Sequence, residues 1–521
     1  MERHSATRGT GGPTSGSTGS GGGSTASRRA DDDITTLDAI ELSRAIHARK
    51  VSCREVMQAY LARIHRLNPR FNALVNLVPD GVALAAAARC DDELSGPGGR
   101  HRGRWGSRGW MHGFPQAIKD TAHAKGLPTT LGSPLLADAV AKVDSIHVQR
   151  MKASGAIVIG KSNMPELGLG SNTYNPLFGR TPNAWDAAVS AGGSSGGGAV
   201  ALALRLLPVA DGSDFMGSLR NPAGWNHIFG LRPSQGRVPA WPKPELWVSQ
   251  LGTDGPMGRT VRDLAALLST QAGHDTRAPL SLASDPVSYV PSDGQASVQD
   301  LRIGWLADLD GHLPMEEGIL PLCEAALERM QAAGASVEPL GAQALGVPAE
   351  ALWEAWLVWR RALVAPSVAA LLAGRPDARA SIKPEALWEY DQAQSLDFAT
   401  FMRAAQVRST FHNHLVGLFD RFDLLALPVA QVWPFDLQWD WPKTVAGRTM
   451  DTYHRWMEVT IYATFAGLPA ISVPAGMHDN GRWPMGLQLI GRPLADAALL
   501  RAAAGYEGLI GDWLARRPAL T

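Results

Sequence analysis

Residues 190–224 constrain the fold of this chain more than any other stretch. They hold two glycine-framed serine clusters, at 192–197 and 214–220, on either side of one apolar run. Glycine lets the backbone approach a ligand closely and turn its N–H groups inward. A serine in such a setting can act as a nucleophile beside an oxyanion hole. Two Gly/Ser loops around a helix are the simpler interpretation, and the more frequent one for a lone GSSG motif.

Composition excludes several classes of protein. Hydrophobic residues make up 45% of the 521 residues, enough for a sizeable core in one large or about two to three ordinary domains. Lys+Arg and Asp+Glu both total 49, so the charge balance favours neither nucleic acid nor anionic lipid as a partner. The cysteines are few, odd in number and far apart, which indicates a reducing compartment and offers no metal-ligand spacing; they are Cys53, Cys90 and Cys323.

Two further stretches bear on domain organisation and location. Residues 1–35, rich in Gly, Ser and Thr, cannot bury enough apolar surface to order themselves, so we expect a disordered leader before one domain over 36–521. No apolar run approaches the ~20 residues that a membrane span needs. Residues 199–210 come closest, but Arg205 and Pro208 interrupt them. The sequence therefore predicts a soluble, cytoplasmic protein.

Helices alternate with strands along the rest of the chain. We expect a helix capped by Ser52, with Glu55 completing a capping box. The alternation predicts an α/β fold with a sheet covered by helices on both faces. The expected elements beyond Arg237 are strands at 301–305, 335–338, 424–428, 470–474 and 485–491 and a helix over 319–333.

Residues 155–162 fit the phosphate-loop expression GxxxxGK[ST], but their context does not. That motif needs a strand before its first glycine and a flexible loop between its glycines. Here the intervening residues 156–159, AIVI, are apolar and suit a strand, and residues 148–154 before them suit a helix. We therefore expect Lys161 to be a structural lysine that follows a buried strand.

Two aromatic features have alternative interpretations. The Gly/Arg/Trp segment 96–110 is more typical of a solvated loop than of a nucleic-acid patch. Trp353, Trp356 and Trp359 recur every third residue on a predicted helix. That spacing favours an aromatic core stripe over the wall of a substrate pocket.

Several segments, taken in order, resemble the amidase signature family of serine hydrolases. GFPQAIKD at 113–120 is similar to that family's lysine strand, and AGGSSGGG at 191–198 and GSDFMGSLRNPA at 212–223 are similar to its two serine loops. The resemblance implies a large central mixed β-sheet with helices on both faces. Further matching segments extend it from about Thr36 to the C-terminus; they are 153–176, 231–239, 254–264, 467–476 and 485–500.

The resemblance implies a Ser–cisSer–Lys triad that cleaves a C–N amide bond through an acyl-enzyme. Carried over position by position, Ser218 is the nucleophile, Ser194 is the bridging serine after a cis peptide, and Lys119 is the base. Ser195 supports their hydrogen bonds. The family places its two serines 24 positions apart, as here, where 218 minus 194 is 24.

A lysine can act as a base only when it is neutral. Burial must therefore lower the pKa of Lys119 from about 10.4 towards neutrality. Lys119 follows an apolar strand, so we expect that burial. There is no GxSxG elbow, and no histidine lies within either serine cluster.

The second serine loop is expected to supply the oxyanion hole through its backbone N–H groups. Met216 stands where the family has glycine; its N–H survives, and the acyl pocket is one candidate place for its side chain. We expect Asp214 and Arg220 to hold this loop in place rather than to contact substrate. The expected oxyanion-hole residues are Phe215, Met216, Gly217 and Ser218.

The 17 tryptophans favour an apolar or aryl amide, anilide or carbamate as substrate. Met216, Tyr453 and Trp456 are the candidate pocket residues. Two alternatives stay open: the glutaminase (A) subunit of a tRNA-dependent amidotransferase, and a catalytically inactive amidase-like binding subunit, which only Met216 favours. We expect no cofactor, no metal, and no nucleic-acid or membrane partner. The sequence does not determine the oligomeric state, and a homodimer is one of the states that it allows.

Overall fold

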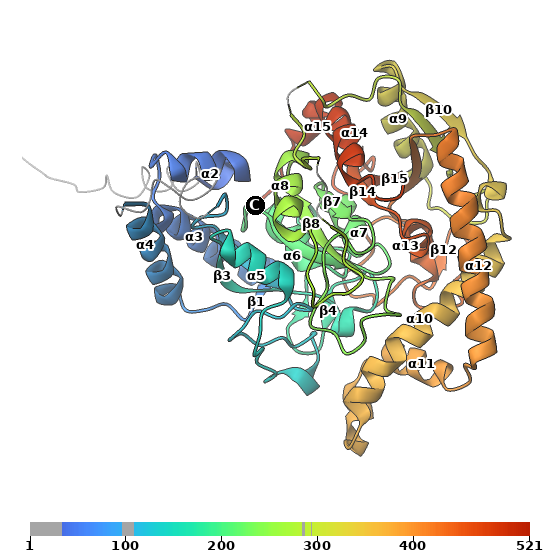
Figure 1. The fold of residues 1–521 in the computed structure, drawn as a ribbon, viewed down its shortest axis with the longest axis horizontal. Coiled ribbons are helices and arrows are strands. Elements are labelled where there is room, and N and C mark those ends of the chain that lie inside the picture. Colours follow the sequence, from blue (N-terminus) through green and yellow to red (C-terminus); the bar gives the residue numbers. More distant parts are fainter. Residues whose placement is uncertain (1–33, 96–108, 284–286, 293, 521) are drawn as a thin grey trace, which may run out of the picture.

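The first described residues already belong to folded structure. Most of the predicted leader 1–35 and of the predicted loop 96–110 lies outside the described residues, but residues 34–36 form a helical turn, so the end of the leader is ordered. Thr35 is buried, and its carbonyl accepts a hydrogen bond from Arg205 Nη1 at 3.3 Å. The computed structural model (Figure 1) describes residues 34–95, 109–283, 287–292 and 294–520.

An eight-stranded sheet forms the centre of the molecule. Its strands are β6 (Ala210–Asp214), β7 (Phe229–Arg232), β8 (Thr253–Gly258), β9 (Arg302–Trp305), β10 (Ser336–Pro339), β11 (Leu424–Pro428), β14 (Ala470–Met477) and β15 (Pro484–Gly491). They run in the order β10-β9-β11-β15-β14-β7-β8-β6. Strand β9 is parallel to both neighbours, and the other pairs are antiparallel. The predicted mixed α/β sheet is confirmed, as are the five strands expected beyond Arg237.

A smaller sheet brings Lys119 to the edge of the large one. Its strands are β1 (Leu74–Val75), β2 (Pro115–Lys119) and β3 (Ile157–Ser162), in the order β1-β3-β2. Strand β2 is parallel to β3, with Lys119 opposite Ser162, and it packs against edge strand β6. Two two-stranded ribbons complete the strands: β4 (Tyr174–Asn175) with β5 (Gly179–Arg180), and β12 (Thr444–Val445) with β13 (Arg448–Thr449).

Helices cover both faces of the large sheet, as predicted. Alternate residues of β11 separate the two layers, because successive side chains of a strand point to opposite faces. Leu424 and Ala426 pack with α8, α9 and α14, whereas Leu425 and Leu427 pack with α10, α12 and α13. The α-helices are α2 (Ala39–His47), α3 (Cys53–Phe71), α4 (Asp80–Ser95), α5 (Ile146–Ala153), α6 (Gly196–Ala203), α7 (Arg220–Trp225), α8 (Val261–Gln271), α9 (Ile319–Ala332), α10 (Ala349–Leu372), α11 (Pro384–Ala393), α12 (Phe398–Gly417), α13 (Ile461–Phe465), α14 (Asp496–Leu509) and α15 (Gly511–Leu514).

Local sequence signals set several of these boundaries. The Ser52 side chain caps α3 and forms the predicted capping box with Glu55. Helix α5 ends at Ala153, before the segment 155–162 that fits the phosphate-loop expression, and the residues between its glycines enter strand β3, as predicted. Lys161 is buried; its Nζ donates to the Ala122 carbonyl and lies 3.6 Å from Asp120 Oδ1. The short 3-10 helices are η1 (Pro134–Leu136), η2 (Glu166–Gly168), η3 (Ala342–Leu345), η4 (Pro376–Ser381), η5 (Leu418–Asp420) and η6 (Arg455–Thr460).

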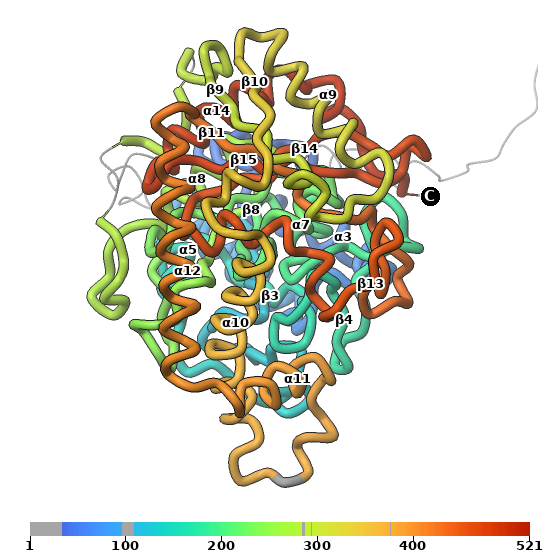
Figure 2. The backbone as a smooth tube through the Cα atoms, turned by 90° about the vertical axis from the view of Figure 1, so that its right-hand side faces the viewer, coloured from blue at the N-terminus to red at the C-terminus, as the bar shows by residue number. Residues whose placement is uncertain are grey.

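Helix α10 is long and apolar enough, by length and composition, to cross a membrane. This corrects the expectation that 199–210 is the chain's closest approach to a span. Helix α10 packs between α11 and α12 (Figure 2), and its three tryptophans are buried in the core, as predicted. It also carries the buried Arg360. A core helix of a folded domain passes the same test, so α10 is weak evidence for membrane insertion.

Candidate active site

The end of β2 and the first serine cluster meet at a buried lysine. Lys119 Nζ lies 2.8 Å from Ser194 Oγ and 2.9 Å from Ser195 Oγ. It also donates to the hydroxyl of Ser213 at 3.0 Å. Lys119 is thus joined by direct hydrogen bonds to two adjacent serines that lie more than 70 positions later in the sequence.

Burial decides the charge of this lysine. Lys119 is fully enclosed, and the loss of hydration lowers its pKa to about 7. The carboxylates of Asp254, Asp214 and Asp211 act in the opposite direction but do not restore the usual value. A substantial fraction of Lys119 is therefore neutral at physiological pH, which confirms the expected depression of its pKa.

Asn221 joins the two serine loops. The peptide between Gly193 and Ser194 is cis, and Gly193 N–H donates to Asn221 Oδ1 at 3.2 Å. Gly192 has φ +75°, and a Cβ there would lie 2.5 Å from the same oxygen, so glycine is required. Ser195 N–H donates to the Ser218 carbonyl at 3.1 Å. The sequence analysis missed Asn221, because its residue type and position give no signal of this contact.

A buried ion pair holds the second serine loop. The Asp214 carboxylate accepts two hydrogen bonds of 3.0 Å from Arg220 and one of 2.9 Å from Gly217 N–H. Burial disfavours its charge, but the guanidinium of Arg220 outweighs that effect and lowers the pKa of Asp214 to about 2. Arg220 also donates hydrogen bonds to Gln488 Oε1 at 2.6 Å and to the Thr460 carbonyl at 3.0 Å. These contacts agree with the predicted loop-holding role of Asp214 and Arg220.

The backbone of this loop differs from the expectation at one residue. Gly217 was expected to contribute its N–H to the oxyanion hole, but that N–H donates to Asp214. The carboxylate of an aspartate three residues earlier reaches it because Gly217 has φ +79°. Among the described residues, the N–H groups of Met216 and Ser218 donate to no protein atom. The candidate hole is therefore narrowed to Phe215, Met216 and Ser218.

The Asp214→Asn variant should lower the free energy of unfolding by about 3–5 kcal/mol, because it leaves Arg220 buried without a counter-charge. Arg421→Met, which breaks an exposed pair with Glu338, should cost about 1 kcal/mol or less. Urea unfolding at neutral pH measures both. The pKa of Asp214 is depressed, so the difference between wild type and Asp214→Asn should shrink as pH falls from about 4 towards 2. Equal losses in the two variants would contradict this account.

The Met216 side chain is buried and turns towards α10. Its Sδ lies 3.9 Å from Nη1 of Arg360, and the Arg360 guanidinium lies over the Phe215 ring at 5.5 Å. Arg360 also donates to Glu389 Oε1 and to the Tyr453 hydroxyl, both at 2.5 Å. Tyr453, a predicted pocket residue, is thus linked to Met216 through a buried arginine that the sequence analysis missed.

Trp456, the other predicted pocket residue, lies deeper in the core. Its ring stacks on Trp225 with centroids 6.1 Å apart and meets Phe435 edge-on at 5.4 Å. Its indole N–H donates to the Tyr453 carbonyl at 2.9 Å. With its ring and its polar atom both engaged by protein groups, Trp456 acts as core, and this corrects its assignment to the pocket.

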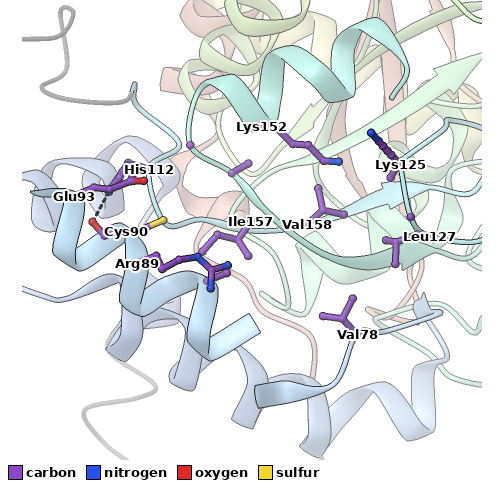
Figure 3. Close-up of a pocket in the computed structure, with 15 residues that line it drawn as sticks. Val78, Arg89, Cys90, Glu93, His112, Lys125, Leu127, Lys152, Ile157 and Val158 are labelled. Carbon is purple, nitrogen blue, oxygen red and sulfur yellow. Dashed lines mark hydrogen bonds between the residues drawn. The ribbon is translucent and has the colours of Figure 1, made fainter. Parts of the chain in front are cut away.

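A hollow of about 490 Å³ lies apart from the serine loops, at β3, α4 and α5 (Figure 3). Its lining includes Cys90, Glu93 and His112, whose ligand atoms lie within 4.8 Å of one another. The fold thus groups a cysteine with other metal-ligating types, which the spacing of the cysteines alone does not reveal. His112 Nε2 makes a 2.9 Å hydrogen bond with the Cys90 carbonyl. This cluster touches none of Lys119, Ser194 and Ser218.

Comparisons with known proteins agree on one family. The family model described as Amidase matches residues 55–500. An acylamidase of Rhodococcus erythropolis is 31% identical and aligns over 94% of this chain and 98% of its own length. The A subunit of the glutamyl-tRNA(Gln) amidotransferase of Chloroflexus aurantiacus is 33% identical, with 91% and 97% covered. A crystal structure of a bacterial aryl acylamidase of the amidase signature family has a TM-score of 0.82 at 29% identity, covering 93% of this chain and 99% of its own. The chain belongs to the amidase family and is an amide-hydrolysing enzyme.

Proposed function

We propose that this enzyme is a serine amidohydrolase that cleaves an apolar or aryl amide, anilide or carbamate through an acyl-enzyme on Ser218. One observation carries the proposal: a buried lysine with a pKa of about 7 donates to Ser194, and Ser194 belongs to the loop that contacts Ser218. A weak serine nucleophile needs such a base nearby. We further propose that residues 36–521 act as one catalytic domain in the cytoplasm.

In the proposed mechanism, protons move along two serines. Neutral Lys119 takes a proton from Ser194, and Ser194 takes one from Ser218 as its Oγ attacks the amide carbon. The carbonyl oxygen becomes an oxyanion that accepts hydrogen bonds from the N–H groups of Phe215, Met216 and Ser218. Collapse breaks the C–N bond, and the leaving amine receives its proton from Lys119 through Ser194. Water then hydrolyses the ester on Ser218 by the same proton route and returns the free enzyme.

The surroundings of the proposed oxyanion loop support an apolar substrate. The Phe215 ring meets Trp356 edge-on at 5.8 Å, and Met216 is only 2% exposed within the aromatic cluster of α10 and α13. The named acylamidase relatives support the same class. A glutaminase that works with partner proteins is the second candidate, because relatives that carry the amidotransferase name are 33% identical to this chain. An inactive binding protein is disfavoured by the intact lysine–serine contacts.

The purified protein should hydrolyse para-nitroacetanilide with a kcat/KM at least about a hundredfold above that for glutamine, because the Phe215, Met216 and Trp356 side chains beside the serine loop carry no charge that could pair with the two charged groups of glutamine. Release of nitroaniline and of ammonia measures the two reactions. Intact-protein mass spectrometry after rapid quenching should detect one acyl group on Ser218. Preferential ammonia release from glutamine would replace this proposal with the glutaminase.

A further inference from the structure

The two helices that follow the serine loops both end at one hollow. Helix α6 starts next to Ser195, and its last residue, Ala203, lines the hollow. Helix α7 starts two residues after Ser218, and the two residues after its end, Asn226 and His227, line the same hollow. The volume of the hollow is about 240 Å³, and its described lining includes none of the three proposed catalytic residues. It is therefore a separate cavity, one helix length away from the serines.

Arginine side chains from three parts of the chain line this hollow. They are Arg205 after α6, Arg259 before α8, and Arg516 and Arg517 after α15. Figure 1 shows the C-terminal end of the chain beside α8. Among the described residues of the lining, Asp38 is the only one with a carboxylate. We call this hollow, with its four arginines, the arginine pocket.

The protein's own contacts satisfy hydrogen bonds of these arginines without balancing their charge. Arg259 donates to the carbonyls of Leu37 and Leu207 at 2.8 and 3.0 Å, and its Nε stays 3.9 Å from Asp38 Oδ1. Arg205 donates to backbone carbonyls through Nη1, whereas its Nε and Nη2 donate to no protein atom among the described residues. A carbonyl accepts a hydrogen bond but has no net charge, so the guanidinium charges remain.

The pKa values of nearby groups agree with an excess of positive charge. Burial, together with the charges of Arg259 and Arg517, lowers the pKa of Arg205 to about 10. Two buried acids lie near the first turn of α8. Burial raises the pKa of Glu507 to about 8, so it is mostly uncharged at pH 7, and raises the pKa of Asp263 to about 6, so it is mostly ionised. Subtracting Asp263 and the carboxylate of the lining from four arginines leaves two positive charges.

A phosphate group matches the arginine pocket in charge and in shape. A phosphate ester has a charge of about −1.5 to −2 at pH 7. Planar guanidinium groups bind its oxygens through paired, charge-assisted hydrogen bonds. The half-buried Trp185 adds an aromatic surface to the lining, which suits an organic group attached to the phosphate.

We propose that the arginine pocket binds a phosphate dianion, either as the free ion or as part of a small phosphate ester. This second binding site goes beyond the proposed amide hydrolysis and does not depend on it. Binding would bring a counter-charge to arginines from three separate segments, and it would therefore hold the tail after α15 against α6 and α8.

Isothermal titration calorimetry of the full chain, near pH 7.5 in Tris-chloride buffer, tests the pocket with three probes. We expect inorganic phosphate to bind with a Kd below about 1 mM. Phenyl phosphate should bind at least about tenfold more tightly than phenyl sulfate, which has nearly the same shape but only one negative charge. Phenyl phosphate that binds more tightly than inorganic phosphate indicates an ester as the ligand, and the reverse order indicates the free ion. Raising NaCl from about 0.05 M to about 0.5 M should weaken phosphate binding, because salt screens charges near the surface.

Substitutions locate the bound phosphate. Arg517→Gln should weaken phosphate binding about tenfold, as the loss of one charge-assisted contact predicts. Adding Arg205→Gln should raise the Kd above about 10 mM. Arg421→Gln is the matched control, because it removes the same charge from an exposed arginine that pairs with Glu338 outside the pocket. It should leave the Kd unchanged.

Three results would each overturn the arginine pocket: a wild-type Kd for phosphate above about 10 mM, equal affinities for phenyl phosphate and phenyl sulfate, or a phosphate affinity that Arg517→Gln leaves unchanged. Arg205 also holds backbone carbonyls, so Arg205→Gln can fail to fold. In that case Arg517→Gln and Arg516→Gln decide, because both side chains are exposed. If wild type hydrolyses no amide but binds phosphate as described, only the proposed function fails.

Discussion

Replacing Ser218 by alanine is expected to lower kcat for amide hydrolysis about 10⁵- to 10⁶-fold. The variant loses the only oxygen that the proposed mechanism uses as a nucleophile, while the Asp214–Arg220 pair that holds the loop stays intact. Substrate binding should change little, because the hydroxyl contributes mainly in the transition state. Single-turnover kinetics with a chromogenic anilide measure the loss in rate, and calorimetry measures the binding.

Labelling with a fluorophosphonate probe tests the role of Ser218 as the nucleophile without the choice of a substrate. Wild type should be labelled at one residue, and Ser218→Ala should not be labelled. Ser472→Ala is the control, because Ser472 is a fully buried serine on β14 that the mechanism does not use. Labelling that persists in Ser218→Ala would exclude Ser218 as the nucleophile. Absence of labelling in wild type would favour the inactive binding protein.

The parts of the site that sequence predicts best are those encoded within short segments. The two serine loops and the lysine strand each carry their glycines and polar residues within about ten positions. Each pattern can therefore be recognised in the sequence without knowledge of the fold. The burial of Lys119 follows from the apolar residues of β2 in the same way. The sheet's class also followed from alternating helices and strands. The order of the strands in the sheet could not be predicted in this way, because the paired strands β9 and β11 are more than 100 residues apart in the sequence.

The parts that sequence missed depend on long-range contacts or on backbone direction. Arg360 reaches Met216 over 144 positions and Tyr453 over 93, and on an apolar helix an arginine gives no hint of either partner. The direction of the Gly217 N–H depends on loop dihedral angles, which residue types do not determine. Trp456 was assigned to a pocket because an aromatic residue next to a motif suits a pocket and a core equally well.

Lys119→Met should lower kcat about as far as Ser218→Ala does, by about 10⁴- to 10⁶-fold, because the two residues act as one unit. Methionine keeps most of the buried volume but cannot accept a proton from Ser194. The double variant Lys119→Met/Ser218→Ala should therefore be no slower than Ser218→Ala alone. Rate losses that multiply in the double variant would show that Lys119 acts separately from the serines.

The pH dependence identifies the charge state in which Lys119 works. A base with a pKa of about 7 is neutral above that value, so kcat of wild type should rise with pH and reach half of its plateau near pH 7. Lys161→Met removes another buried lysine, on the neighbouring strand β3, and should leave this midpoint in place. A wild-type midpoint near pH 10 would mean that Lys119 keeps its ordinary pKa and that the proposed base is wrong.

The depressed pKa also predicts a stability difference with a definite sign. The unfolded chain keeps the Lys119 proton up to about pH 10.4, whereas the folded chain releases it near pH 7. Between these values the unfolded state binds more protons, so this lysine makes the free energy of unfolding rise with pH. Urea unfolding from pH 7 to pH 10 should reveal this rise in wild type and in Ser218→Ala but not in Lys119→Met. Because Ser218→Ala is inactive yet keeps the lysine, the comparison separates the charge of Lys119 from catalysis itself.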